Sequence, residues 1–119
     1  MRFTIRQGAR LPALAIRLRQ TNAAVSLVGA TGAFRMETSA GEAVSLAGAV
    51  AITNAAEGLA EFQWGEGDTD VSGDYRGEFV FDYGTGEAPD KLTVPIEDSL
   101  TVRVLDSLEP DETTTTAEV

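Results

Sequence analysis

Two stretches in the middle of the chain alternate between apolar and polar residues, and this period of two constrains the fold most. In 59–64 the side chains of Ala60, Phe62 and Trp64 share one face, and in 75–83 every second residue is aromatic or glycine. Such alternation is typical of half-buried strands in an antiparallel sheet, because successive side chains point to opposite faces. The sequence therefore predicts two strands, joined by a turn rich in acids and glycine.

The rest of the chain supplies short extended segments separated by turn residues. Further strands are expected at 2–6, 13–19, 33–38, 43–53, 92–94 and 99–105, with a short extended piece at 25–28. Alanine, leucine and arginine also favour a helix at 13–19, but the strict alternation there argues for a strand. A bend is expected near Gly48. Pro95 cannot donate to a ladder, so it should end the strand at 92–94.

Seven or eight short strands with no convincing helix predict an all-β fold, and we expect an immunoglobulin-like antiparallel β-sandwich. The phrase Gly73-Asp-Tyr75 resembles the entry to a late strand of such a sandwich, where a tyrosine hydroxyl bonds back to the preceding turn. A chain of 119 residues is one domain, which we place at residues 1–106. Residues 107–119 are acidic and threonine-rich, and we expect them to form a short tail that is disordered or ordered by a partner.

The composition excludes several kinds of chemistry. The chain contains no cysteine and no histidine, which removes disulfides, thiolate metal sites, the commonest general base and the Ser-His and Cys-His nucleophile pairs. No apolar run is long enough to span a membrane, and the first residues lack the apolar core of a secretion signal. We expect a protein made in the cytoplasm that binds no membrane and no cofactor.

The charges are divided unevenly along the chain. Residues 1–36 hold six arginines and no acid, whereas residues 37–119 hold three bases and nineteen acids, and the net charge is −10. An acidic domain repels phosphate backbones, so nucleic-acid binding is not expected. The basic first third could dock an acidic neighbour, including a second copy of the chain, or its strands could simply pair beside acidic strands. The candidate interaction residues are Arg2, Arg6, Arg10, Arg17 and Arg19.

The acidic turn partly fits a calcium-binding pattern. The run from Asp68 to Gly73 matches the opening of an EF-hand loop, where oxygens at alternate positions surround the ion. Phe79 occupies the twelfth position, where that loop needs a glutamate. Because aspartate, serine and glycine also cluster in ordinary turns, we expect no metal site. The calcium candidates that the pattern offers are Asp68, Asp70, Ser72 and Asp74.

Two further groups of residues could carry chemistry. No spacing selects a pair of carboxylates for acid–base catalysis, and alternation places Glu61, Glu78 and Asp82 on solvent faces. The six aromatic residues between 62 and 83 could form a platform on which sugars stack, although aromatic side chains on one face of a strand more often belong to the core. This set comprises Phe62, Trp64, Tyr75, Phe79, Phe81 and Tyr83. We expect a protein that is not an enzyme, and a carbohydrate-binding module, with or without calcium, stays open as an alternative.

A series of short motifs resembles a known family in sequence order. The motifs are Phe3-Thr-Ile-Arg-Gln-Gly8, Leu11-Pro-Ala-Leu14, Val25-Ser-Leu-Val-Gly-Ala-Thr31, Phe34-Arg-Met36, Gly58-Leu-Ala-Glu-Phe-Gln-Trp64, Gly67-Asp-Thr69, Gly73-Asp-Tyr-Arg76 and Leu100-Thr-Val-Arg-Val104. Together they cover about residues 3–105. In this order they resemble the immunoglobulin-like N-terminal domain of phage baseplate upper proteins and related tail-associated virion modules.

The resemblance implies a structural part of a virion. Such domains attach a tail or baseplate component to the particle, usually with a fibre or receptor-binding region after them, whereas here only the acidic tail follows. The expected function is a small adaptor or accessory protein of the tail or baseplate, present in many copies, that docks onto other virion proteins and copies of itself. A capsid decoration or head-associated protein is the alternative within the same class.

Overall fold

The computed structural model describes residues 1–21, 23–84, 91–95 and 99–106, and this part of the chain contains strands and no helix. The strands are β1 (Arg2–Arg6), β2 (Leu14–Arg17), β3 (Arg19–Gln20), β4 (Ala23–Ala24), β5 (Thr31–Thr38), β6 (Ala49–Asn54), β7 (Leu59–Gln63), β8 (Gly73–Asp82), β9 (Lys91–Val94) and β10 (Leu100–Leu105). The predicted all-β class is confirmed. The predicted tail at 107–119 lies outside the described residues. Among the described residues we find no membrane-spanning helix.

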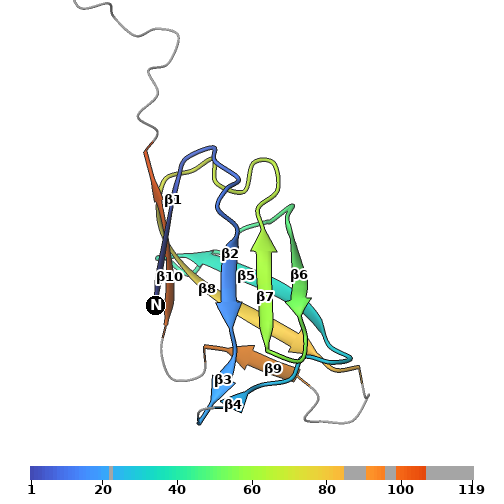
Figure 1. Cartoon of the computed structure of the whole chain (residues 1–119). Coiled ribbons are helices and arrows are strands. Elements are labelled where there is room, and N and C mark those ends of the chain that lie inside the picture. Colours follow the sequence, from blue (N-terminus) through green and yellow to red (C-terminus); the bar gives the residue numbers. More distant parts are fainter. Residues whose placement is uncertain (22, 85–90, 96–98, 107–119) are drawn as a thin grey trace, which may run out of the picture.

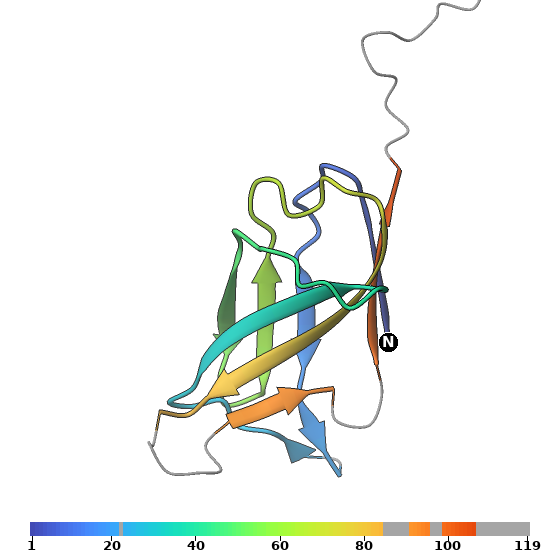
Figure 2. The same cartoon turned by 180° about the vertical axis from the view of Figure 1, so that it is seen from behind.

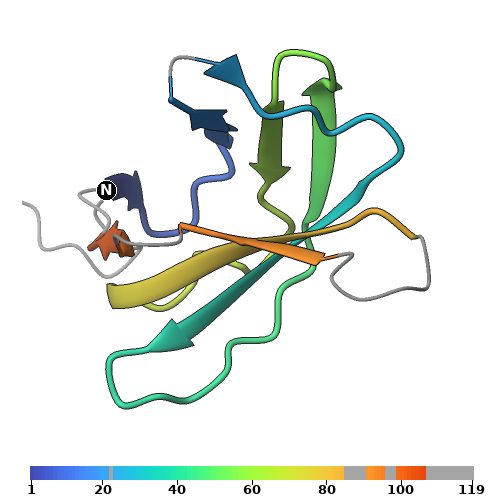
Figure 3. The same cartoon turned by 90° about the horizontal axis from the view of Figure 1, so that it is seen from below.

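Two sheets lie face to face (Figures 1 and 3). The larger has the order β1-β10-β8-β5, and the smaller has the order β2-β7-β6, while β3 and β4 form a short hairpin. Strand β8 is the longest and pairs with β5 along one edge. Its other edge is shared by β10 over the first half and β9 over the second half (Figure 2). This strand order is compatible with an immunoglobulin-like sandwich.

The sandwich is not purely antiparallel, because β1 pairs with β10 in parallel. The prediction was wrong at this pair. Parallel neighbours need a long crossover connection, which a short hairpin cannot provide. Here nearly the whole domain separates the two strands, so local sequence patterns carry no information on their relative direction.

Three predicted segments also differ from the observed strands. The strand predicted at 13–19 is interrupted at Leu18, whose N–H donates to the Gly58 carbonyl at 2.8 Å, and β3 continues in the separate hairpin. The piece predicted at 25–28 is not a strand, since the hairpin uses Ala23–Ala24 instead. Of the strand predicted at 43–53, only the part from Ala49 onward pairs as a strand, apart from an isolated bridge at Ala43.

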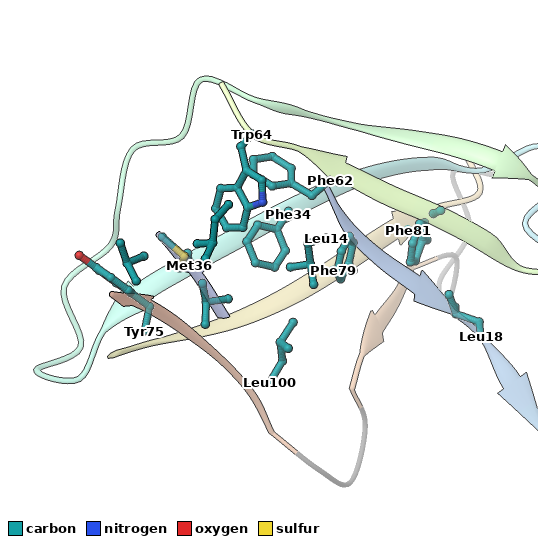
Figure 4. Close-up of a cluster of buried hydrophobic side chains, with 14 of the residues drawn as sticks. Leu14, Leu18, Phe34, Met36, Phe62, Trp64, Tyr75, Phe79, Phe81 and Leu100 are labelled. Carbon is teal, nitrogen blue, oxygen red and sulfur yellow. The ribbon is translucent and has the colours of Figure 1, made fainter. Parts of the chain in front are cut away.

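The core lies between the two sheets and consists of the side chains that alternation placed on the inner faces (Figure 4). Phe34 of β5 contacts Phe62 of β7 with ring centroids 4.9 Å apart, and this pair joins the two layers. The rings of Phe79 and Phe81 are fully buried. A side chain at Gly77 would meet the Phe34 ring at 2.6 Å, so this glycine leaves room for the ring.

The predicted tyrosine contact is present at the start of β8. The Tyr75 hydroxyl donates to the Val71 carbonyl at 2.6 Å, four residues earlier, and the side chain is buried. Tyr75→Phe is expected to lower the free energy of unfolding by about 1 kcal/mol, because it leaves the Val71 carbonyl without this donor. Urea unfolding followed by the fluorescence of Trp64, the single tryptophan, measures the change. Tyr83→Phe is the matched control, since it removes an exposed hydroxyl contact to Ser26.

The same hydroxyl gives the protein a pH dependence. Burial raises the pKa of Tyr75 above its usual value, so the unfolded chain loses this proton at a lower pH than the folded chain. The stability contributed by the hydroxyl is therefore complete below the unfolded pKa and is lost as pH rises through the folded pKa. The stability advantage of wild type over Tyr75→Phe should shrink in alkaline buffer. No difference in stability between wild type and Tyr75→Phe at any pH would show that the contact is not stabilising, and a difference that stays constant in alkaline buffer would show that folding does not raise the pKa of Tyr75.

Candidate functional site

The acidic turn between β7 and β8 is tied to a distant segment by one buried aspartate. Asp68 is 7% exposed. Its Oδ1 accepts the N–H of Ala47 at 2.6 Å, and its Oδ2 accepts the N–H groups of Gly48 at 2.9 Å and Gly65 at 2.7 Å. We call these four residues the Asp68 junction. Both carboxylate oxygens are thus engaged by backbone donors and fasten the segment before β6 to the end of β7.

The other calcium candidates do not join Asp68 in a common site. The Asp74 carboxylate accepts a hydrogen bond from Arg103 of β10 at 3.1 Å, and Asp70 uses its backbone carbonyl to accept the side-chain amide of Gln7. Ser72 is half-buried. No three acidic side chains gather to hold a metal ion anywhere in the described ranges. The turn is therefore a structural connection in which each acidic residue has a separate position.

The aromatic side chains lie inside the sandwich. Phe62, Trp64, Tyr75, Phe79 and Phe81 are all at most 7% exposed, which confirms that they are core. Trp64 stacks against Phe3 and meets Phe62 edge-on. A sugar-binding platform needs exposed aromatic faces, so these five rings do not supply one. Tyr83 is half-buried, and its hydroxyl bonds to Ser26.

The outer face of the larger sheet carries two ion pairs beside a shallow hollow of about 450 Å³. Arg35 of β5 pairs with Glu78 of β8, and Glu37 of β5 pairs with Arg76 of β8. Both pairs join residues that lie directly opposite each other on β5 and β8. Here a basic residue does pair with an acidic residue of the neighbouring strand, as the charge distribution suggested. Exposed pairs of this kind contribute little stability. Each of the two carboxylates that line the hollow thus faces an arginine.

The other arginines of the basic first third differ from Arg35 in their surroundings. Strand β1 lies beside Thr101, Arg103 and Leu105 of β10, so its arginines have no acidic strand next to them. The Arg6 guanidinium donates to the carbonyl of Asp106 at 3.2 Å, and that of Arg10 donates to the Trp64 carbonyl at 3.1 Å. The pairing of basic strands beside acidic ones is therefore wrong for β1.

The remaining candidate arginines are all exposed. Arg2 lies on β1, Arg17 on β2 and Arg19 on β3. Strands β1 and β2 are edge strands of the two sheets and run along the same side of the sandwich (Figures 1 and 3). Two of the five candidates thus lie on β1, one on β2 and one on β3, and the structure does not bring them into one pocket.

The sequence interpretation missed the outer edge of β6. This strand pairs with β7 on one side, and no strand of the described part pairs with its other side. No charged residue occurs between Glu42 and Glu57, although the chain as a whole is strongly acidic. Unpaired, uncharged edges can recruit another chain, and proteins usually block them with charges or proline. The sequence feature that could have identified this edge is the absence of charged residues from 43 to 56, not the apolar content of that stretch.

Comparisons with known proteins identified no relative of this chain. A scan against family models, a search of curated proteins and a search of solved structures each found no match.

Proposed function

We propose that this protein is a non-enzymatic structural component of a phage particle, an adaptor or accessory protein of the tail or baseplate that docks onto neighbouring virion proteins. The observation that carries the proposal is the unpaired, uncharged edge of β6 in a chain of net charge −10. Such an edge can be kept in a stable protein when assembly covers it. A virion component meets its neighbours at fixed positions and high local concentration, which suits this kind of interface.

Two further observations support a docking role. The resemblance of the ordered motifs over residues 3–105 to tail-associated virion domains gives the particle context. The arginines around β1 and β2 offer a basic side to acidic neighbours, and charge complementarity favours specific encounter. A capsid decoration or head-associated protein would use the same edge and is the alternative location within the particle.

Particle composition tests this function directly. Virions from a culture of the organism that encodes the chain would be banded by density and analysed by mass spectrometry. We expect peptides from this protein in the banded particles in many copies. Their absence from the particles, while the protein is abundant in the lysate, would rule out a virion role.

A charge placed on the β6 edge should prevent incorporation. Ala51 lies on the outer face of β6, opposite Glu61 of β7, and lysine at an edge strand disfavours pairing with another chain. Ala51→Lys is expected to reduce the number of copies per particle by at least about tenfold, which corresponds to a loss of about 1.4 kcal/mol in binding. Quantitative mass spectrometry of purified particles measures this number.

The matched control is Ala15→Lys on β2. Ala15 is exposed and also lies opposite Glu61, on its other side, so the two variants add the same charge beside the same carboxylate. Ala15→Lys should leave incorporation near the wild-type value, and both variants should unfold at the wild-type temperature. Normal incorporation of Ala51→Lys would show that β6 is not the docking edge.

A further inference from the structure

A second edge, that of β1, presents free backbone groups on the basic side of the molecule. Thr101 of β10 donates to the Met1 carbonyl at 2.9 Å, and the Gln7 N–H donates to the Leu105 carbonyl at 2.7 Å. Backbone groups alternate sides along a strand, so Arg2, Thr4 and Arg6 direct theirs away from β10. No strand in the described part pairs with this side of β1.

Most of these groups have no partner within the described residues. The Arg6 carbonyl accepts the N–H of Ala9 at 3.0 Å, which closes the turn after β1. Arg2 and Thr4 are exposed, and within the described part of the chain neither makes a hydrogen bond or ion pair outside the pairing with β10. An extended peptide could therefore pair with Arg2, Thr4 and the Arg6 N–H by strand addition. Its side chains would meet the guanidinium groups of Arg2 and Arg6.

The chain itself contains a segment whose sequence fits this edge. Residues 107–119 carry four acids and no base, and they include four consecutive threonines, 113–116. Threonine is β-branched and favours strands, and acids beside the arginines would form opposite-charge pairs of the kind that stabilise neighbouring strands. The segment also starts at a defined place, because the Asp106 carbonyl already accepts the Arg6 guanidinium.

We infer that the β1 edge binds residues 107–119 of a second copy of this chain. A return of the segment onto its own β1 is disfavoured, because it would have to pass the turn at Arg6–Ala9 within a few residues. That turn is fixed at this end of β1, since the Gly8 N–H donates to the Thr69 carbonyl at 3.0 Å. Donor and acceptor surfaces on each copy differ, so the contact is heterologous and produces rings or linear chains of copies.

This inference is independent of the phage proposal, because it needs only the β1 edge and the acidic segment. Sedimentation velocity of the full-length chain over a range of concentrations, in low and in high salt, measures the association. We expect assemblies that grow with concentration and weaken in high salt, since screening reduces attraction between exposed charges. A monomer at every concentration in low salt would overturn the inference and would leave the β6 docking edge untouched.

Charge reversal in the full-length chain identifies the two partners. One variant carries Arg2→Glu and Arg6→Glu at the edge, and the other carries Asp111→Lys and Glu112→Lys in the segment. Each variant alone should associate at least about tenfold more weakly than wild type, because like charges now face each other. Equimolar mixing should restore association, since each variant supplies the partner that the other lacks.

The control is Lys91→Glu, which reverses an exposed base on β9, a strand that pairs with β8 and not with β1. It should associate like wild type, which separates the β1 edge from a general effect of net charge. The inference fails if either double variant associates as strongly as wild type, or if mixing the two variants restores nothing.

Discussion

Asp68→Ala is expected to lower the free energy of unfolding by about 3 to 5 kcal/mol, because three part-buried N–H groups lose a charged acceptor. The donors are the backbone N–H groups of Ala47, Gly48 and Gly65. Among the described residues these N–H groups have no other acceptor. Domains of this size are stable by only about 5 to 15 kcal/mol, so the variant should be close to the limit of folding. Urea unfolding followed by Trp64 fluorescence measures the loss.

Two further variants test whether this loss comes from the hydrogen bonds of the Asp68 junction. Asp68→Asn keeps the shape but turns an amide toward backbone donors, so it should be nearly as damaging as Asp68→Ala. Asp70→Ala removes an exposed carboxylate from the same turn and should change stability by less than about 0.5 kcal/mol. Equal effects of Asp68→Ala and Asp70→Ala would contradict the junction.

Calcium provides a further test of the acidic turn. If the carboxylate of Asp68 serves the backbone, the unfolding temperature of wild type should be the same in calcium and in a chelator. A calcium-dependent rise in that temperature, lost in Asp70→Ala, would instead support the metal-binding pattern.

The acidic turn shows where sequence reasoning reaches its limit. In the run from Asp68 to Gly73, the sequence pattern gives Asp68 and Asp70 the same role. Each could be a ligand in a calcium loop or an ordinary residue of a polar turn. They differ only because the backbone at 47–48 lies against one of them, about twenty residues away in sequence. A pattern confined to the turn cannot contain that information, since the contact depends on how the two segments pack.

Local alternation did predict the central strands well. The inner faces of β7 and β8 follow from period two alone, whereas the hydroxyl contact of Tyr75 was predicted from the resemblance of Gly73-Asp-Tyr75 to the strand entry of an immunoglobulin-like sandwich. Both depend on neighbours in sequence. The strand predicted at 43–53 forms only from Ala49 onward. Before it, Ala47 and Gly48 donate to the Asp68 carboxylate instead of a ladder.

The arginines show the same difference between what local sequence predicts and what depends on the pairing of distant strands. Arg35 is neutralised by Glu78, whereas Arg2 has no acidic partner in the described structure, and nothing in the local sequence distinguishes the two. The register between β5 and β8 places one arginine opposite an acid, and the parallel pairing of β1 with β10 places the other beside a neutral strand end. Charge totals could therefore predict a basic side but not which arginines remain available to a partner.

The second large loss of stability is expected from a substitution at Gly48, where two backbone segments approach each other closely in the Asp68 junction. A side chain at Gly48 would overlap the Gln63 carbonyl oxygen and would lie 2.7 Å from the Phe62 ring and 2.8 Å from the Gly65 nitrogen. Two of these atoms are backbone, so no change of rotamer can relieve the overlap. Gly48→Ala should cost about 3 kcal/mol, the upper part of the range for overpacking, because one segment must move away from the other.

Movement of that segment would also lengthen the bonds from Ala47 and Gly48 to Asp68, so the two substitutions should not be additive. The double variant Gly48→Ala with Asp68→Ala is expected to be more stable than the sum of the single losses predicts, by about 1 kcal/mol or more. Ala49→Val, on the exposed outer face one residue later, is the control and should change stability by less than about 0.5 kcal/mol. Strict additivity in urea unfolding would mean that the glycine and the carboxylate act on separate parts of the fold, and a Gly48→Ala variant as stable as wild type would mean that the two backbones do not approach this closely.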